Sequence, residues 1–343
     1  MESTIKAVIA GCGATGSAYA SCFLNMPQVE VTAVYDKREE AAGQLAGRCG
    51  AQAFTSFERM FSETAADVVC ICLPAALHKE FAFIAAFHGK HIICHTPIAP
   101  NLSDAQTMIE VCREKGVKLY VAQSMRFLPQ YANLRREIRS GSIGSVGVAH
   151  MKRTGPAPFH AEEAVHDDGS VILDWMLHDI DITRSVLGEV KSVYAMNRKT
   201  GKHDYALATL RFESGAIANL EAYMGHPEPM AAAVEFAGNG GLIRFNSSDA
   251  ASMRIRKNGA QAAASAPGTC SRTVAPIWAE DAYMSQLEHF IACLRQGREP
   301  DGTAYDAYKA LEIALAAVLS SRTGVPAHIG TPSVTEEQRY AAN

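Results

Sequence analysis

The sequence predicts a two-domain α/β protein, with a doubly wound parallel sheet first and an α+β domain with a large, mainly antiparallel open sheet after it. In the first third of the chain, short apolar runs alternate with helical stretches, as they do where crossover helices join parallel strands. From about residue 145, short strands are separated by tight turns, and strands joined so tightly must run antiparallel. With 343 residues the chain has room for both domains, which we place at 1–124 and 125–343.

The first domain begins with the pattern of a dinucleotide-binding turn. An apolar strand over residues 5–10 leads into Gly11-Cys12-Gly13-Ala14-Thr15-Gly16, and a helix and a second strand follow before Asp36. The first glycine makes the tight turn, the second lets a pyrophosphate approach the backbone, and the third lets the helix pack close to the strand. Free N–H groups at the helix start complete a phosphate site. The pattern therefore predicts a Rossmann domain that binds a dinucleotide.

Asp36 indicates which dinucleotide this is. Its carboxylate is placed to accept hydrogen bonds from both ribose hydroxyls, and a 2′-phosphate there would meet a like charge. Lys37 and Arg38 could instead bind that phosphate, or they could simply begin a solvated helix over residues 37–47. We expect NAD as the cofactor and leave NADP open.

The remaining strands of this sheet place further residues near the cofactor. Strands are predicted over residues 68–73, 91–94 and 117–122, with helices over 77–88 and 103–115 between them. In a parallel sheet the ligand lies at the carboxyl ends of the strands. The residues expected at those ends are Leu73, Pro74, His95, Thr96, Pro97 and Gln123.

The second domain is predicted from strands over residues 146–153, 190–197, 206–212, 216–223, 233–237, 242–245 and 252–256. Helices follow near 281–295 and 305–322. One face of such a sheet would stay open, so we expect a homo-oligomer, a dimer or tetramer, formed through it.

Bulk properties exclude several classes of protein. A formal net charge of −4 without a basic face argues against nucleic-acid and anionic membrane partners. No apolar run reaches the ~20 residues of a membrane span, and the first residues lead into a strand and do not resemble a signal peptide. The nine cysteines are odd in number and form no C-x-x-C pair, which fits reduced thiols in a cytoplasmic enzyme.

The stretch 171–187 carries the strongest chemical signal outside the nucleotide site. It is helical in pattern and largely apolar, yet Asp174, His178 and Asp181 are spaced for one face. An imidazole titrates near neutral pH and a carboxylate one turn away can orient it, so the pair suits proton transfer. The alternative is a structural polar stripe. We favour catalysis because buried charge is costly unless it is paired or used.

The preceding loop, 159–169, is rich in histidine and acid. His160, His166, Asp167 and Asp168 could suggest a metal site, but their spacing matches no fixed ligand pattern. We expect no metal and interpret the loop as one that lies over the substrate, with Phe159 and Asp168 in contact with it.

Several of these motifs together resemble the Gfo/Idh/MocA family (glucose–fructose oxidoreductase, inositol dehydrogenase, rhizopine catabolism). The resemblance spans almost the whole chain. It rests on the glycine-rich turn with Asp36, the Pro74…His78 element, residues 89–99, the Arg126-Phe127…Pro129 junction, and residues 141–144, 169–181 and 304–326. It implies a Rossmann domain, an α/β domain with a large sheet, and oxidation of a hydroxyl or reduction of a ketone on a sugar or cyclitol with NAD(P).

The resemblance also implies roles for single residues. Asp174 and His178 match the family's D-x-x-x-H pair, with His178 as the proton shuttle. His78 falls in the cofactor-binding element. Substrate contacts are expected from Arg126, Arg153, Trp175 and Tyr283, although the two aromatic residues could equally be core residues.

One departure from the family matters for the chemistry. Where the family usually has Glu-Lys-Pro, this chain has His95-Thr96-Pro97. A threonine can donate one hydrogen bond but carries no charge, and the loss of a cation from a dry site could cost orders of magnitude in rate. Either His95 takes over as an electrophile or proton carrier, or His178 suffices. Pro97 keeps the strand-end turn and allows a cis peptide before it. A second departure is Pro74-Ala75-Ala76, where an asparagine often follows the proline in the family and helps to hold the cofactor.

Three functions are consistent with the sequence. The leading one is an NAD-dependent dehydrogenase or reductase acting on a sugar, inositol or related polyol. A second is an enzyme that keeps NAD bound and catalyses a reaction with no net redox change. The third is a nucleotide- or sugar-sensing protein that lost the lysine; the retained Asp174/His178 pair argues against it.

Overall fold

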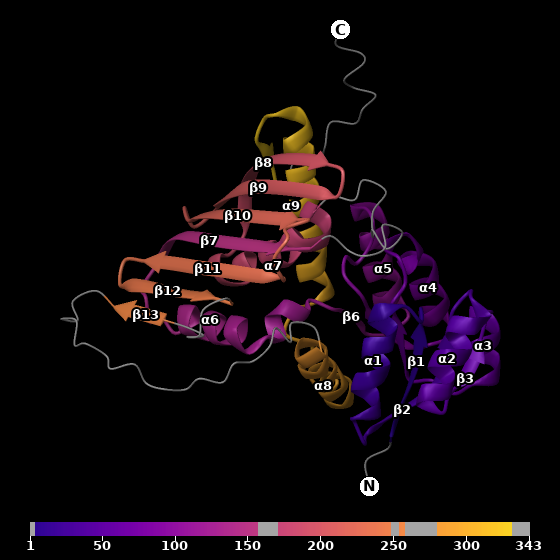
Figure 1. Ribbon diagram of the computed structural model, residues 1–343. Helices are drawn as coiled ribbons and strands as arrows, with labels where there is room; N and C mark the ends of the chain where they lie inside the picture. Colours follow the sequence, from indigo (N-terminus) through magenta and orange to yellow (C-terminus); the bar gives the residue numbers. More distant parts are fainter. Residues whose placement is uncertain (1–3, 157–170, 248–253, 258–279, 331–343) are drawn as a thin grey trace.

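The computed structural model describes residues 4–156, 171–247, 254–257 and 280–330. It contains two sheets that lie side by side, each with its own helices (Figure 1). This arrangement confirms the predicted fold class, with a parallel sheet first and a mainly antiparallel sheet second.

The first sheet has six parallel strands in the order β3-β2-β1-β4-β5-β6. Chain order therefore reverses between β1 and β4, which is where such sheets bind their ligands. The strands are β1 (Ile5–Ala10), β2 (Val29–Tyr35), β3 (Gln52–Phe54), β4 (Val68–Ile71), β5 (His91–Cys94) and β6 (Leu119–Val121). The helices are α1 (Ala14–Leu24), α2 (Glu39–Cys49), α3 (Phe57–Glu63), α4 (Ala75–Phe87) and α5 (Leu102–Glu114).

The central strands are apolar because both of their faces are covered. All four residues of β4 are buried, as are all but one residue of β1. β3 and α3 are absent from the sequence-based prediction. β3 has only three residues, two of them exposed, so it shows no apolar run.

The second sheet has eight strands in the order β13-β12-β11-β7-β10-β9-β8-β14. Neighbours run antiparallel except for β7 and β10, which pair in parallel along eight residues. The strands are β7 (Val146–Gly155), β8 (Val190–Thr200), β9 (His203–Phe212), β10 (Ile217–Met224), β11 (Ala231–Gly238), β12 (Gly241–Asn246), β13 (Arg254–Lys257) and β14 (Ala327–His328).

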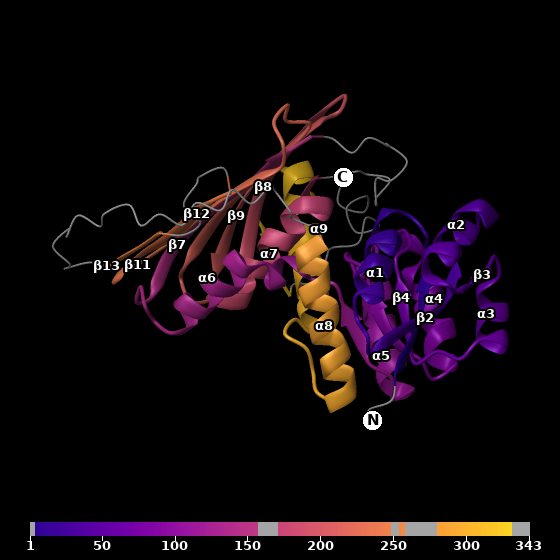
Figure 2. The ribbon, with the colours of Figure 1, turned by 60° about the horizontal axis from the view of Figure 1, so that its bottom comes forward.

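Helices cover one face of this sheet and leave the other open (Figure 2). They are α6 (Pro129–Arg139), α7 (Leu177–Leu187) and α9 (Ala304–Thr323), and a 3₁₀ turn over Ser124–Phe127 leads into α6 from the first domain. Strand residues alternate accordingly, so that Ala218, Leu220 and Ala222 of β10 are buried under the helices.

Helix α8 (Glu280–Gln296) returns to the first domain, although it lies far along the chain (Figures 1 and 2). Leu287, Phe290 and Ile291 are buried in the same apolar cluster as Tyr19 and Phe23 of α1. The ring of Phe290 lies 5.1 Å from that of Tyr120 in β6. The nucleotide-binding half is thus completed by a helix from the second half of the sequence.

Among the described residues, no helix combines the length and apolarity that a membrane span needs.

Candidate active site

The glycine-rich turn has the geometry that a dinucleotide requires. Gly11 has φ +100°, and a Cβ atom there would lie 2.4 Å from the carbonyl oxygen of Cys72. A Cβ at Gly16 would lie 1.9 Å from the carbonyl oxygen of Gly11. At Gly13, by contrast, a Cβ would meet nothing within 4 Å, so the space beside that backbone is open. Helix α1 begins directly after it at Ala14 and has no acidic side chain in its first turn, which leaves its positive end for an anion.

Asp36 lies at the carboxyl end of β2 and is bound from two sides. Its Oδ2 accepts a hydrogen bond from the backbone N–H of Cys12 at 2.9 Å, and its Oδ1 accepts from the backbone N–H and Nε of Arg38 at 2.9 and 3.1 Å. Burial tends to raise the pKa of Asp36, but these hydrogen bonds outweigh it and hold the pKa below its usual range. Asp36 is therefore a fixed anion beside the turn, while the neighbouring Lys37 is exposed.

His78 has a structural position. It is 1% exposed, its Nε2 lies 2.7 Å from the carbonyl oxygen of Leu73, and its Nδ1 lies 3.2 Å from that of Ile98. Its imidazole therefore links the loops after β4 and β5, and its part in cofactor binding stays a prediction. The second of these loops contains the cis peptide between Thr96 and Pro97.

Buried polar atoms without a partner collect at the ends of β5 and β6 and on the helix that carries His178. Among the described residues they include Thr96 Oγ1, both amide atoms of Gln123, Asp174 Oδ1 and His178 Nδ1. A buried polar group without a hydrogen bond is costly and needs an explanation. A bound cofactor and substrate would supply the missing partners. Together with the open space beside Gly13, these atoms show that the residues present fit a dinucleotide.

Asp174 and His178 lie on a helix that is not uniform. Residues Ile172–Met176 form a π-helical segment, and α7 continues from Leu177. The sequence predicts a single α-helix here, because a side-chain pattern does not reveal a change in backbone hydrogen bonding; π segments occur often at functional sites. Both side chains remain partly exposed, so a ligand can reach them.

The surroundings shift the pKa values of Asp174 and His178 in opposite directions. Burial, with the nearby Asp204 carboxylate adding to it, raises the pKa of Asp174 to about 6. Burial, together with the charge of Arg153 and the neighbouring His95, lowers the pKa of His178 to about 3. Burial and His78 lower the pKa of His95 to about 4. At neutral pH both imidazoles are uncharged, and a neutral imidazole can accept a proton.

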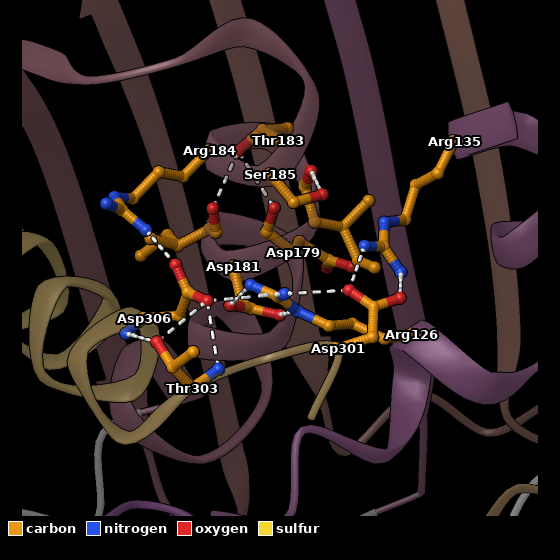
Figure 3. Close-up of polar contacts among 12 residues, drawn as sticks. Arg126, Arg135, Asp179, Asp181, Thr183, Arg184, Ser185, Asp301, Thr303 and Asp306 are labelled. Atoms are coloured by element: carbon orange, nitrogen blue, oxygen red, sulfur yellow. Dashed lines mark hydrogen bonds and ion pairs between the residues drawn. The ribbon is translucent and has the colours of Figure 1, made fainter. Parts of the chain in front are cut away.

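Two further aspartates of α7 bind the arginines that the sequence assigns to substrate. Arg126 donates from Nε and Nη2 to Asp181 at 2.6 Å each (Figure 3). Arg153 donates from Nη2 to Asp179 at 2.5 Å. All four side chains are at most 4% exposed. In the ligand-free protein both guanidinium groups are therefore held by aspartates of α7, and their contact with substrate stays a prediction.

The Arg126–Asp181 pair belongs to a larger network (Figure 3). Arg135 binds Asp301 at 2.6 and 2.9 Å, and Arg184 binds Asp306 at 2.6 Å. Nη1 of Arg126 lies 3.5 Å from Asp301 and 3.6 Å from Asp306. The network thereby joins the 3₁₀ turn, α6, α7 and the start of α9.

The two aromatic candidates occupy different places. Tyr283 of α8 shares a hydrogen bond with the side chain of Thr15 and packs edge-on against Tyr19, with ring centroids 5.3 Å apart. It therefore lies at the glycine-rich turn. Trp175 packs against the core of the second domain, where its Cη2 lies beside Gly155 of β7. Phe159 and Asp168 are outside the described residues, as are the other acidic and histidine residues of their loop.

Comparison with known proteins identifies the chain. Residues 5–123 match the model of an oxidoreductase family with an NAD-binding Rossmann fold, and residues 135–329 match the C-terminal α/β domain of the same family. The chain belongs to the Gfo/Idh/MocA family. The glycine-rich turn and Asp36 are thus part of the NAD-binding domain of an oxidoreductase, as the resemblance implied.

Two relatives and one solved structure show what the chain is similar to. The chain is 28% identical to a scyllo-inositol 2-dehydrogenase (NAD⁺) of Bacillus subtilis, over 96% of this chain and 97% of that protein. It is 28% identical to a 2,7-anhydro-N-acetylneuraminate hydratase of Escherichia coli, over 62% and 60%. Its fold matches the structure of a levoglucosan dehydrogenase in complex with NADH and levoglucosan, with a TM-score of 0.84, 21% identity and coverage of 96% and 100%.

Sequence reasoning missed Asp179 and Gln286. Asp179 is 2% exposed and follows His178 on an apolar helix. An acidic residue in such a helix needs a buried cationic partner, and this was the signal that the sequence offered. Gln286 is fully buried, and its amide group lies 3.0 and 3.2 Å from the backbone nitrogens of Gln123 and Ser124, whose N–H groups its oxygen accepts when the amide is turned toward them. No signal in the sequence links α8 to that turn.

Proposed function

We propose that the protein transfers hydride between NAD and a hydroxyl-bearing carbon of a sugar, inositol or related polyol, with His178 as the proton shuttle. The observation that carries this is the pair of unpartnered buried atoms, His178 Nδ1 and Asp174 Oδ1, on a partly exposed helix of an NAD-binding oxidoreductase. When bound, NAD supplies the two-electron acceptor. Turn residues 11–16 and Asp36 hold the cofactor, and Thr96 donates a hydrogen bond to the reacting oxygen.

Proton movement follows from the protonation states. The low pKa of His178 leaves its imidazole neutral at pH 7, so it can take the proton of the substrate hydroxyl as the carbon is oxidised. In the reverse direction the same group returns the proton. Asp174 Oδ1 and His178 Nδ1 have no hydrogen-bond partner in the ligand-free protein, so both are available to the substrate. The relatives named as an inositol dehydrogenase and a levoglucosan dehydrogenase support a polyhydroxylated substrate.

The decisive test is reduction of NAD, followed by absorbance at the NADH band, across a panel of sugars, inositols and sugar acids. We expect turnover with at least one compound, and a His178→Gln variant that still binds NAD but loses about 10²–10⁴-fold in kcat. NADP in parallel tests the role of Asp36, and we expect it to be the poorer cofactor. Tight NAD binding without reduction by any compound would contradict the proposal.

A redox-neutral reaction is the second candidate. It is favoured by the uncharged Thr96 at the reacting oxygen and by a relative that is named a hydratase. Transient oxidation by bound NAD would activate the substrate for elimination, and the cofactor would end unchanged. Product formation from a sugar derivative without any release of NADH distinguishes this function from the first.

We also propose that the open face of the second sheet pairs with a second copy of the chain. This face exposes three large apolar side chains, Tyr194 (39%), Met196 (53%) and Ile217 (37%). A group of exposed apolar side chains often marks a contact with another protein. Sedimentation of the wild type and of Met196→Glu tests this. We expect a dimer or tetramer that the charge weakens, and a monomeric wild type would contradict it.

A further inference from the structure

Arg153 contacts the helix that carries His178 without being exposed to a ligand. It lies in β7, is 2% exposed, and holds Asp179 through Nη2 at 2.5 Å and Nε at 3.3 Å. Its Nη2 also lies 3.4 Å from the hydroxyl of Tyr131 in α6. Asp179 directly follows His178 in the chain. The guanidinium is therefore anchored one residue away from the proposed proton shuttle.

The end of β7 lies along the same turn of helix. Arg153 and Gly155 are two residues apart in the strand and so point to one face of the sheet. A Cβ atom at Gly155 would come within 3.1 Å of Trp175 Cη2. β7 thus contacts the helix at Trp175, three residues before His178, and at Asp179, one residue after it.

The charges around His178 make Arg153 distinctive. The groups that act on the imidazole from other elements are Arg153 of β7 and His95 after β5. Asp174, Asp179 and Asp181 are the acids of its own helix. His95 is neutral at pH 7, because burial and His78 lower its pKa to about 4. Thr96, at the position where family members usually have lysine, adds no charge. Arg153 is then the cation that acts on this histidine.

We propose that Arg153 is a positioning residue for His178, which fixes the imidazole through Asp179 and supplies the positive field that Thr96 does not. This rests on the proposed function of His178. The field of a buried cation is strong because little solvent screens it. Burial has the larger effect on the pKa of His178, and the field of Arg153 adds to it, so the imidazole stays a neutral proton acceptor well below pH 6.5. The field also favours the negative charge that develops on a substrate oxygen as its proton leaves.

The chain offers a matched control on the same helix. Arg126 and Asp181 form an equally buried ion pair, but Arg126 is not among the groups that act on His178. The variants Arg153→Met/Asp179→Asn and Arg126→Met/Asp181→Asn each remove one buried pair without leaving a lone charge. In the control, Asp301 keeps Arg135 and Asp306 keeps Arg184. A general loss of packing should affect both variants alike.

The test is the titration of His178 in the full-length protein, followed by NMR of ¹³C-labelled histidine rings and assigned with His178→Gln. We expect the wild-type signal to stay unprotonated from pH 8 to pH 5. In Arg153→Met/Asp179→Asn we expect the titration midpoint to rise, although burial keeps it below the ordinary histidine value, and in the Arg126 control we expect no rise. An unchanged midpoint, or an equal rise in the control, would overturn the proposal.

Arg153→Lys supplies a second readout if the double variant folds poorly. It keeps the charge but loses the planar fork that holds Asp179. We expect the His178 titration to match the wild type while kcat falls by about tenfold with little change in KM, because the imidazole is less well held. A raised midpoint in this variant would contradict the charge argument. The NMR titration needs no substrate, so a protein that turns over no sugar but shows the expected shift refutes the proposed function alone.

Discussion

Gly16 lies so close to Gly11 that a Cβ atom at position 16 would come within 1.9 Å of the carbonyl oxygen of Gly11. The start of α1 and the end of β1 therefore touch through bare backbone. Gly13, between them, has open space in the same direction. One motif thus contains a glycine required for the fold and a glycine required for a ligand.

This difference predicts opposite outcomes for two alanine variants. Gly16→Ala should lower the free energy of unfolding by several kcal/mol, because backbone must move to admit the methyl group. Gly13→Ala should fold with a nearly unchanged unfolding midpoint but bind NAD at least about tenfold more weakly, because the methyl group occupies the path of the pyrophosphate. Urea unfolding and calorimetric titration with NAD measure the two effects. Equal losses of stability would disprove this division of roles.

Asp174 predicts that stability depends on pH. Its pKa is about 6 in the folded protein, against an ordinary value of 3.8, so between these values the folded chain holds a proton that the unfolded chain has released. The free energy of unfolding must then fall as pH rises from about 4 to 6. Asp174→Asn should be more stable than wild type by on the order of 2 kcal/mol at pH 7, and equal to it below pH 4. Urea unfolding at both pH values checks this; a difference that does not vary with pH would contradict it.

Removing the hydroxyl of Thr96 should affect stability and activity in different directions. Its hydroxyl is buried without a partner in the ligand-free protein, so Thr96→Val should leave stability unchanged or raise it by about 1 kcal/mol. If the hydroxyl binds the reacting oxygen, the same variant should lose about 10–100-fold in kcat, whereas Thr96→Ser keeps the donor and most of the rate. Steady-state kinetics beside thermal unfolding separate the effects. A fully active Thr96→Val would remove Thr96 from the mechanism.

Loss of Arg126 should lower the free energy of unfolding strongly. Arg126→Met leaves Asp181 charged and buried, which should cost about 3–5 kcal/mol in the free energy of unfolding. Adding Asp181→Asn should recover much of this loss. Arg59 is the control, because its ion pair with Glu63 is 69% and 45% exposed and Arg59→Met should change stability by less than about 0.5 kcal/mol. Similar losses for both arginines would show that burial does not decide the value of these pairs.

The sequence predicts most of what depends on neighbouring residues. The turn at residues 11–16 is recognisable because strand, glycines, helix and acid follow one another within a single local unit. The cis peptide before Pro97 is likewise a local property, and the structure has it. The alternation of burial along β10 follows from its period of two.

Contacts between distant segments could not be predicted in the same way. Arg126 and Arg153 show a charge in the sequence but not its partner, so the sequence does not reveal that Asp181 and Asp179 bind them. The parallel pairing of β7 with β10 joins strands that are not consecutive. The position of α8 depends on its apolar residues fitting against α1, which no local pattern encodes.

The return of α8 to the first domain has a consequence for how such proteins can be recombined. A fragment that ends at residue 124 would leave the apolar surface around Tyr19, Phe23 and Tyr120 uncovered, since Phe290 and its neighbours fill it in the intact chain. A chimera that exchanges the nucleotide-binding half between relatives would therefore need three crossover points, one before the second sheet and one on each side of α8, because α9 and β14 follow α8 in the chain but belong to the second sheet.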